Sequence, residues 1–449
     1  MHAPGLVIAA TQSSSGKTLV TLGLIRALTR RGLTVASFKV GPDYIDPAFH
    51  LAAGAVRCPN LDSWAMQLPT LARLAEAAAH DVDLVVGEGV MGLFDGGPEG
   101  RGSTADVASL LGLPVVLTVD AKGMGQSVAA LAAGFAEFRD DVDVTGVICN
   151  RTGGPRHDQL LAEALDARLP GLRLGALPLD GRLKLPSRHL GLVQARERDL
   201  EPLIEQAGHL VEAYLDLDRI EGLAAPMALA AFGPPGPILP PPGQRIALAD
   251  DEAFAFVYAA VVEGWRRAGA SIHPFSPLAD EAPDRAADAV ILPGGYPELH
   301  AGRLAAAATF RAGVRAAAER GAVVYGECGG FMVLGEALVD ADGERHPMLG
   351  LLPSATSFAE RRLHLGYRRL RLRAPGFLGE PGALYRGHEF HYARLIEPGD
   401  APALFDAADA AGRPLGPAGA RRHNVAGSFM HLIDRAAPER PRVVDPVSS

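Results

Sequence analysis

The stretch from residue 6 to residue 18 constrains the fold of this chain more than any other. Residues 6–10 are apolar and few enough for a buried strand, and residues 19–28 repeat apolar side chains at helical spacing. The loop between them holds small and hydroxyl residues and closes on Gly16-Lys17-Thr18. A strand, a loop of this kind and a helix, in that order, are typical of a phosphate-binding loop. The chain is therefore expected to build a nucleotide site beside its first strand.

The sequence of the loop predicts a role for each of its last residues. The backbone N–H groups around Ser15 and Gly16, together with the start of the helix, would surround a phosphate. Lys17 would reach the β- and γ-phosphates of ATP, and Thr18 would place its hydroxyl on Mg²⁺. Thr11 replaces the first glycine of the usual G-x-x-x-x-G-K-[ST] pattern. An ordinary turn with a surface lysine is the alternative, which the flanking strand and helix disfavour.

Size, charge and cysteine usage exclude several classes of function. The 449 residues are enough for two or three domains, and 48% of them are hydrophobic, so large cores can be buried. The net charge of −9 comes from intermixed signs, which argues against a nucleic-acid surface. No apolar stretch approaches the roughly 18 residues of a membrane helix, and no signal-peptide pattern is present. The widely spaced Cys58, Cys149 and Cys328 indicate reduced thiols in a cytoplasmic enzyme.

Strands and helices alternate through the first half, which predicts an α/β fold with a parallel sheet covered by helices on both faces. Ligands of such folds collect beyond the carboxyl ends of the strands. Lys39 ends the second strand, and Asp43 and Asp46 follow it, so all three should lie near the phosphates. Lys39 can neutralise phosphate charge, and the two carboxylates can hold Mg²⁺ directly or through water. A structural turn rich in Pro, Asp and Gly is the alternative for each aspartate.

Other polar residues also follow predicted strands. Glu88 comes directly after a buried strand, where nucleotide hydrolases place a second metal ligand, and Asp95 lies on the same loop as a substrate contact. Helix capping or an ion pair is the alternative for Glu88. Asn150 ends a later strand and could bond an adenine edge or cap the next turn. Arg188 and His189 lie on a later loop and are candidates to contact an acidic substrate.

Composition divides the chain into three parts. Residues 1–223 form the expected ATP-binding domain, and residues 224–244 are rich in proline and glycine, which is typical of a stiff, extended linker. A second alternating pattern fills residues 245–449. We therefore expect two α/β domains joined by a linker.

One cysteine of the second domain has the surroundings of a nucleophile. The strand at residues 322–325 leads to Gly326-Glu327-Cys328-Gly329-Gly330, and apolar residues at helical spacing follow. A nucleophile in a sharp, glycine-rich turn between strand and helix resembles the nucleophile elbow of hydrolases. The helix N-terminus would lower the thiol pKa. Backbone N–H groups of Gly294, Gly295 and Gly329 would form the oxyanion hole. A buried structural cysteine is the alternative.

A cysteine nucleophile needs a base, and His431 is the best candidate because it ends the last apolar segment, as triad histidines of α/β folds often do. Asp434 is a candidate to orient it. His388 and His391 compete for the role of the base, and the role of Glu389 between them is open. Zinc binding is disfavoured because His-Glu-x-His lacks the helical i, i+4 pairing and a clear third ligand.

A triphosphate site and a cysteine hydrolase site in one chain fit an amidation. ATP makes a carboxylate reactive by converting it to an acyl phosphate. Cys328 would release ammonia from the side-chain amide of glutamine, leaving a glutamyl thioester that water cleaves. The ammonia would need a shielded path between the two domains.

Over essentially the whole chain, the sequence resembles the cobyrinic acid and hydrogenobyrinic acid a,c-diamide synthases, which amidate corrinoids in cobalamin biosynthesis. The stretches that carry the resemblance are residues 11–18, 39–47, 88–96, 185–192, 326–330 and 386–392. The resemblance implies a first domain similar to dethiobiotin synthetase and a second domain similar to class I glutamine amidotransferases. It also implies successive amidation of the c and a acetate side chains, with two ATP and two glutamine consumed.

The same resemblance makes Cys328 the nucleophile and His431 its activating partner, and ties Asp43, Asp46 and Glu88 to ATP, metal or substrate. Class I amidotransferases carry a glutamate two residues after the histidine, where this chain has Ile433, so the third member of the triad is open. Neighbouring alternatives are cobyric acid synthase and the nickel-sirohydrochlorin a,c-diamide synthase. An alternative of another class is a P-loop switch ATPase with a non-catalytic second domain. The oligomeric state, with a homodimer among the options, is open.

Overall fold

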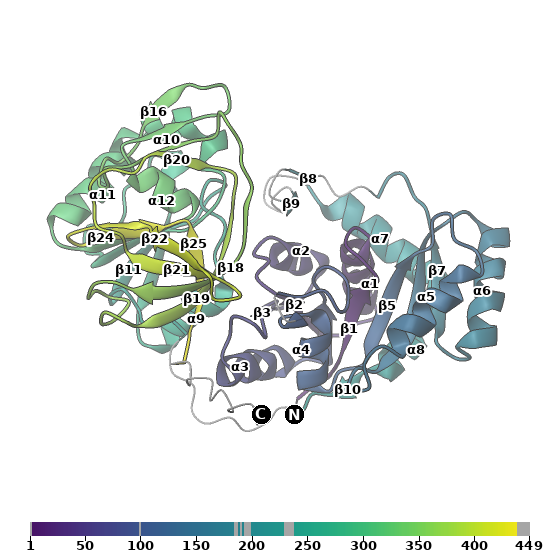
Figure 1. Cartoon of the computed structure of the whole chain (residues 1–449). Coiled ribbons are helices and arrows are strands. Elements are labelled where there is room, and N and C mark those ends of the chain that lie inside the picture. The colour runs from purple at the N-terminus through teal and green to yellow at the C-terminus, as the bar shows by residue number, and fades with distance from the viewer. Residues whose placement is uncertain are drawn as a thin grey trace, which may run out of the picture.

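A computed structural model describes residues 2–97, 100–183, 199–228 and 238–437 in full, and the backbone of residues 187–188 and 191–192. Two α/β lobes lie side by side, the N-terminal one in purple to teal and the C-terminal one in green to yellow (Figure 1). Among the described residues, no helix is both long enough and apolar enough to cross a membrane. The predicted α/β class is confirmed.

The N-terminal lobe is built on one sheet whose main path runs β3-β2-β4-β1-β5-β6-β7, with all neighbours parallel. A short strand, β10, pairs antiparallel with β1. The strands are β1 Pro4–Ala10, β2 Val35–Val40, β3 Asn60–Leu61, β4 Leu84–Glu88, β5 Val115–Asp120, β6 Val144–Thr152, β7 Arg173–Pro178 and β10 Ala225–Pro226, with β8 Ser187–Arg188 and β9 Gly191–Leu192 as a separate hairpin. The helices are α1 Lys17–Arg30, α2 Asp46–Ala53, α3 Leu68–Ala79, α4 Thr104–Leu111, α5 Ser127–Ala136, α6 Pro155–Arg168, α7 Glu201–Tyr214 and α8 Leu217–Leu223.

The central strands of this sheet are buried on both faces. Residues 6–10 of β1 and all of β4 are buried, which is why these strands read as continuous apolar runs in the sequence. Helices of this lobe flank the sheet in Figure 1. The parallel arrangement brings the carboxyl ends of β1, β2 and β4 to one edge, where the phosphate-binding loop begins.

The C-terminal lobe contains a six-stranded sheet, β12-β11-β13-β14-β24-β23, and two smaller ones, β22-β21-β18-β19-β25 and β16-β15-β17-β20. Its first strands are β11 Arg245–Ala249, β12 Ser271–Phe275, β13 Ala289–Leu292, β14 Val323–Glu327, β15 Ala337–Val339, β16 Arg345–Pro347 and β17 Ala355–Ser357. The later strands are β18 His364–Leu372, β19 Leu384–His391, β20 Arg394–Glu397, β21 Phe405–Asp409, β22 Pro414–Ala418, β23 Ala420–Arg422, β24 Val425–Ser428 and β25 Met430–Arg435. The helices are α9 Ala259–Arg267, α10 Ala301–Ala306, α11 Ala308–Glu319 and α12 Gly329–Leu334, with short 3₁₀ turns η3 Pro277–Ala279 and η4 Pro297–Leu299.

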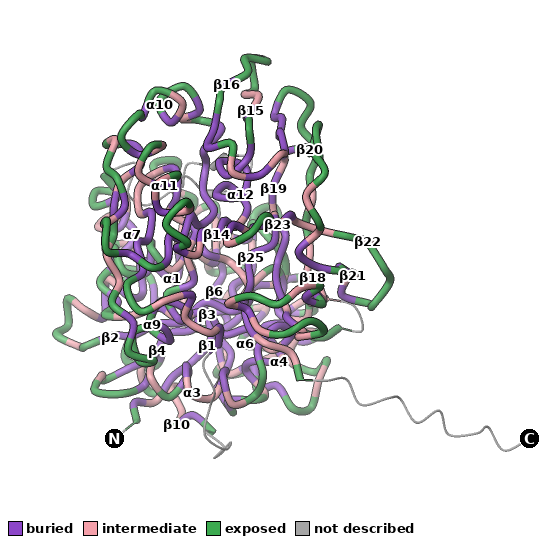
Figure 2. Tube along the Cα trace, turned by 90° about the vertical axis from the view of Figure 1, so that its left-hand side faces the viewer, coloured by how far each residue is buried: buried purple, intermediate pink, exposed green. Residues whose placement is uncertain are grey.

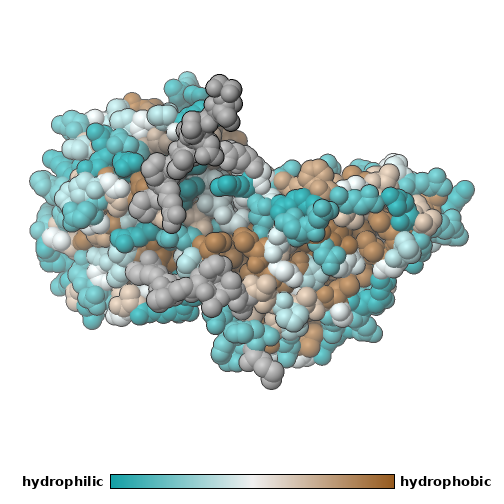
Figure 3. Space-filling view, turned by 60° about the horizontal axis from the view of Figure 1, so that its bottom comes forward, coloured by the Kyte–Doolittle hydropathy of each residue, from teal (hydrophilic) through white to brown (hydrophobic). Residues whose placement is uncertain are grey.

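The central sheet strands and the inner faces of the helices are buried, and exposed residues lie mainly on loops and outer helix faces (Figure 2). On the face shown in Figure 3, apolar residues also gather near the junction of the two lobes. The larger hydrophobic core contains residues of both lobes. The lobes are therefore packed against each other as well as joined through the chain.

Polar contacts and stacked rings also join the two lobes. The Tyr258 hydroxyl donates to the Pro42 carbonyl at 2.9 Å, and the Tyr367 hydroxyl donates to Asp62 at 2.8 Å. The Tyr367 ring stacks on Trp64 with centroids 4.4 Å apart. These contacts fix the segments that follow β2 and β3 against the C-terminal lobe.

Candidate active sites

The loop between β1 and α1 has the backbone of a phosphate-binding loop. Gly16 adopts φ 85°, in the left-handed region, and a Cβ there would lie 2.2 Å from Nδ2 of Asn150, so only glycine fits. The Asn150 amide donates to the Ser15 carbonyl at 2.8 Å. Asn150 therefore supports the loop from β6, a role that neither sequence interpretation included. Its contact with adenine stays a prediction.

Lys17 and Thr18 open α1 and point toward the end of β4. The Lys17 ammonium donates to the Met91 carbonyl at 3.1 Å, and the Thr18 hydroxyl donates to Glu88 at 2.7 Å. Burial, followed by the nearby Lys39, lowers the pKa of Lys17 to about 8. Burial disfavours the charged ammonium of Lys17, and a bound phosphate would stabilise it. The N-terminus of α1 also favours an anion at this place.

Glu88 lies at the centre of a buried charge cluster. One of its oxygens accepts from Lys39 Nζ at 2.8 Å, and the other lies 2.6 Å from Nε2 of His50. Lys39 Nζ also donates to Asp46 at 2.5 Å. Burial would raise the pKa of Glu88, but Lys39 and His50 outweigh it and hold that pKa far below its ordinary value. The predicted residues Lys39, Asp46 and Glu88 thus lie together in one hydrogen-bonded network, in which burial and the nearby Asp43 raise the pKa of Asp46 to about 7.

His50 belongs to this cluster, and sequence reasoning missed it. Its Nδ1 lies 3.0 Å from the Ser37 hydroxyl, and the residue is fully buried on α2. Burial disfavours its charge, yet Cys58 and Glu88 raise the pKa of His50 to about 10. His50 lies one helical turn after Asp46, so the periodicity of α2 was the available signal.

The other acidic candidates have local roles in this structure. Asp43 accepts from the N–H groups of Ile45 and Asp46 at 2.8 and 3.0 Å, which orders the start of α2. Asp95 is exposed and accepts from the Gly92 N–H at 2.9 Å.

The two basic candidates cannot be placed in the same way. Only the backbone of Arg188 is described, on β8, and His189 lies outside the described residues.

Cys328 occupies a sharp turn between β14 and α12. Its φ of 46° and ψ of −107° are unusual for a residue with a side chain, as the nucleophile elbow predicts. A Cβ on Gly330 would lie 1.8 Å from the Leu292 carbonyl oxygen, so the turn needs glycine there. The Cys328 N–H donates to the Ser428 carbonyl at 2.8 Å and ties the turn to β24.

The structure brings His431 to this cysteine. A Cβ built on Gly294 would lie 3.0 Å from Nε2 of His431 and 3.3 Å from Cβ of Cys328, so all three residues meet at one point. Within the described part of the chain, the buried His431 Nε2 has no hydrogen-bond partner. Gly295 and Gly329 adjoin the same point, since the Gly295 nitrogen lies 3.1 Å from a Cβ built on Gly329.

Burial keeps the thiol and the imidazole neutral. Cys328 and His431 are each 1% exposed. Burial raises the pKa of Cys328 well above its ordinary value, and the hydrogen bond from the Gly329 N–H only partly offsets this. Burial also lowers the pKa of His431 to about 3, with His388 and His391 adding to the effect. The expected lowering of the thiol pKa is wrong, because burial outweighs the effect of the short helix α12.

The carboxylate expected to orient His431 faces elsewhere. Asp434 accepts from the backbone N–H of Gln67 at 2.9 Å and from its neighbour Arg435. Asp434 and His431 pair with Arg386 and His388 of β19 across a β-bulge, so alternation along β25 does not separate them. Both Asp434 oxygens are, however, already bonded to backbone N–H groups. Asp434 therefore contributes to the lobe interface.

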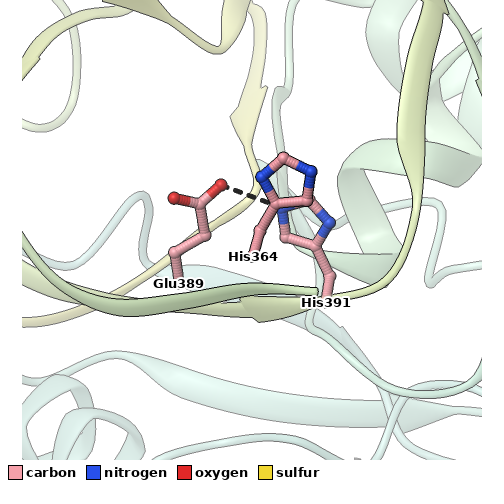
Figure 4. A group of neighbouring side chains, drawn as sticks. All are labelled: His364, Glu389 and His391. Atoms are coloured by element: carbon pink, nitrogen blue, oxygen red, sulfur yellow. Dashed lines mark hydrogen bonds and ion pairs between the residues drawn. The ribbon is translucent and has the colours of Figure 1, made fainter. Parts of the chain in front are cut away.

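His391, Glu389 and His364 form a compact group (Figure 4). The His391 Nε2 lies 2.9 Å from Glu389, and its ring stacks on His364 with centroids 4.7 Å apart. Arg368 donates to the other Glu389 oxygen at 2.6 Å. His364 is a third potential ligand that sequence reasoning missed, but Glu389 already has two cationic or donor partners. The arrangement favours a charge network that holds β18 against β19.

A cavity of about 830 Å³ lies between the two lobes. Ser13, Thr18 and Asp43 line it from the nucleotide lobe. The C-terminal lobe contributes Tyr367, Arg368, His388 and Phe390 among others. The Cys328 sulfur lies 3.9 Å from the Phe390 carbonyl oxygen, so the cavity wall adjoins the thiol. One cavity therefore borders both candidate sites.

Tyr44 of the nucleotide lobe packs directly on the imidazole of the other lobe. Its ring centroid lies 4.6 Å from that of His431 and 4.4 Å from that of Phe256. Its buried hydroxyl has no hydrogen-bond partner among the described residues, and the residue also lines the cavity. Sequence reasoning used this motif only for Asp43 and Asp46, so it missed the aromatic residue between them.

Two family models match the chain. A CobQ/CobB/MinD/ParA nucleotide-binding domain matches residues 6–193, and a CobB/CobQ-like glutamine amidotransferase domain matches residues 245–438. The hydrogenobyrinate a,c-diamide synthase of Mesorhizobium japonicum is 55% identical over 443 residues, which cover 97% of this chain and 100% of that protein. The protein of the same name from Brucella anthropi is 54% identical over 437 residues, covering 96% and 98%. PurLQS from Thermotoga maritima aligns at 20% identity over 42% of this chain and 86% of that one, with a TM-score of 0.31.

Proposed function

Because this chain belongs to the hydrogenobyrinate a,c-diamide synthase family, we propose that it converts the a and c acetate carboxylates of hydrogenobyrinic acid to primary amides with ATP and glutamine. It is a glutamine-dependent carbon–nitrogen ligase of cobalamin biosynthesis. The observation that carries the proposal is the single cavity that borders both the phosphate-binding loop and the Cys328 site. Cobyrinic acid, the cobalt-containing counterpart, is the alternative substrate.

In the nucleotide lobe, the substrate carboxylate attacks the γ-phosphorus of ATP. An acyl phosphate forms, and ADP leaves. Lys17 supports this step because its buried ammonium can stabilise charge on the transferring phosphoryl group. The backbone N–H groups at the start of α1 bind the other phosphate oxygens.

We also propose that Mg²⁺ accompanies the ATP. Thr18, Asp43, Asp46 and Glu88 would hold it, since hydroxyl and carboxylate oxygens are the ligands that Mg²⁺ prefers. The low pKa of Glu88 supports this assignment, because a carboxylate ligand must be ionised. Burial and Asp43 raise the pKa of Asp46 to about 7, and a bound cation would favour its ionised form. When bound, Mg²⁺ would neutralise charge on the β- and γ-phosphates. Lys39 donates to both Glu88 and Asp46.

In the C-terminal lobe, the Cys328 sulfur attacks the side-chain carbonyl carbon of glutamine. The thiol proton passes to Nε2 of His431 and then to the departing nitrogen, so ammonia leaves and a glutamyl thioester remains. Water cleaves the thioester and restores the thiol. We assign the oxyanion hole to backbone N–H groups of Gly294, Gly295 and Gly329, which adjoin the thiol.

Ammonia then crosses the cavity between the lobes and attacks the acyl phosphate, releasing phosphate and forming the amide. The volume of about 830 Å³ also suits a large ligand. Apolar lining residues would contact the macrocycle of the substrate, and Arg368 and His388 would meet its carboxylates. The substrate itself would close the cavity to water, which keeps ammonia from escaping.

Replacing Tyr44 by alanine is expected to lower glutamine-dependent amidation roughly 10- to 100-fold, because the ring that holds His431 would be lost. Amidation from added ammonium chloride should fall much less, by no more than the effect of losing one wall residue of the cavity. Tyr44→Phe keeps the ring and should restore most of the activity. Gln67→Ala, which removes a hydrogen bond to Arg435 across the same interface, is the matched control. Equal loss with both nitrogen sources in Tyr44→Ala would contradict this role.

A substrate panel tests the proposed function. The purified protein is incubated with ATP, Mg²⁺, glutamine and, in turn, hydrogenobyrinic acid, cobyrinic acid, its a,c-diamide and nickel-sirohydrochlorin, and products are read by mass. We expect two amidations of hydrogenobyrinic or cobyrinic acid. Amidation of the a,c-diamide would indicate cobyric acid synthase instead, and amidation of the nickel complex alone would indicate the other sister enzyme. ATP hydrolysis without any amide would indicate a switch ATPase.

We place the enzyme in the cytoplasm, where its three buried thiols would stay reduced. We propose that the protein forms a homodimer, which a measurement of its molecular mass in solution would test.

A further inference from the structure

The active-site imidazole has a neighbour that the sequence motif of class I amidotransferases does not include. Glu327, the last residue of β14, places one carboxylate oxygen 3.8 Å from Nδ1 of His431. Its other oxygen accepts from the backbone N–H of Leu432 at 3.1 Å. The same side chain therefore contacts the imidazole and the backbone directly after it.

The two nitrogens of the imidazole face different partners. Nε2 lies at the point where Gly294 and Cys328 meet, and Nδ1 faces Glu327. A base that serves a nucleophile with one nitrogen needs a group that fixes its tautomer through the other. We propose that Glu327 is the positioning residue for His431, in the place that a glutamate after the histidine takes in class I amidotransferases. This inference rests on the proposed function.

The other candidates for this role fail on geometry. Ile433 stands at the expected position and is a buried apolar residue. Asp434 accepts from the backbone N–H groups of Gln67 and Arg435, which occupy both of its oxygens. Glu389 lies between His391 and Arg368, which occupy both of its oxygens. Among the described residues, Glu327 has the ion-pair contact with His431 Nδ1 that these three lack.

Glu327 acts on charge and orientation and takes no proton from the reaction. When the thiol proton moves to Nε2, His431 becomes a buried cation with an N–H at Nδ1. The ionised carboxylate of Glu327 stabilises that cation and keeps the ring turned toward Cys328. The 3.8 Å separation is within the range of an ion pair once His431 carries the proton.

The ionisation of Glu327 should appear in the pH profile of glutamine hydrolysis. Burial raises the pKa of Glu327 to about 8. The titratable groups that face it are Tyr325 and Cys328 on its own segment, His431 on β25 and Tyr258 before α9. Because the ionised form is the active one, the rate should rise as the pH passes through this pKa.

Glu327→Gln tests the inference, because glutamine keeps an acceptor for the Leu432 N–H but loses the charge. We expect kcat for glutamine hydrolysis to fall at least about tenfold, with KM for glutamine and ammonia-dependent amidation changed less than about twofold. The rise of the rate near pH 8 should disappear. Glu327→Asp keeps the charge at a greater distance and should give an intermediate rate.

Asp434→Asn is the matched control and should hydrolyse glutamine as the wild type does. The inference fails if Glu327→Gln keeps the wild-type kcat and pH profile, or if it loses ammonia-dependent amidation to the same degree as glutamine hydrolysis. Loss of hydrolysis in Asp434→Asn alone would assign the role to Asp434. If the wild-type protein releases no glutamate from glutamine, that result would instead contradict the proposed function itself.

Discussion

Replacing Cys328 by alanine is expected to lower glutamine-dependent amidation by about 10³-fold or more, while amidation from ammonium chloride stays within about twofold of the wild type. In the proposed mechanism the sulfur forms the thioester, so its removal should stop the release of nitrogen from glutamine. The proposed acyl phosphate step takes place in the other lobe, across the cavity, so it should not need the thiol. The measurement is product formation by mass with each nitrogen source in turn.

Cys149→Ala is the matched control for this experiment. Cys149 is equally buried but lies in β6, inside the sheet of the nucleotide lobe. It should retain activity with both nitrogen sources. Undiminished glutamine-dependent amidation in Cys328→Ala would show that another group supplies the nitrogen.

Lys17→Ala is expected to abolish amidation from glutamine and from ammonia alike, by roughly 10²- to 10³-fold. Its ammonium lies at the start of α1, where the β- and γ-phosphates should bind, so neither nitrogen source can bypass its loss. Glutamine hydrolysis without ATP should remain, because the lysine lies in the other lobe. Comparing amide formation with glutamate release in the same samples separates the two outcomes.

Lys17→Arg provides a second test at this position. It keeps the charge but changes the geometry of the donors, so we expect it to recover only part of the activity. Robust amidation by Lys17→Ala with ammonium chloride would mean that the acyl phosphate does not form at this loop.

The sequence predicted the nucleotide lobe well, because its central strands are buried on both faces and read as short apolar runs. Residues 6–10, 84–86 and 115–120 all lie in predicted parallel strands. The antiparallel sheet of β18, β19, β21, β22 and β25 was not predicted as a unit. Its register joins residues far apart in the chain, such as His388 with His431, and no local pattern carries that information.

The residues of the candidate sites also fall into those that a local motif predicts and those that only the folded structure brings together. Local motifs identified Lys17, Glu88 and Cys328, because each motif is a short segment whose backbone creates the site. The contact of Tyr44 with His431 joins two domains, so no single motif contains it. The expectation that the thiol pKa of Cys328 is lowered was wrong because it considered only the helix N-terminus. The burial of the thiol, which raises the pKa, has no local signal in the sequence.

The central claim is that nitrogen released at Cys328 reaches the substrate carboxylate through the protein. It is tested most directly by supplying glutamine labelled with ¹⁵N in its side-chain amide, together with ATP, hydrogenobyrinic acid and an excess of unlabelled ammonium chloride at neutral pH. We predict that the diamide product carries ¹⁵N in both new amides. A product whose amides carry the unlabelled nitrogen of the surrounding solution would contradict the account.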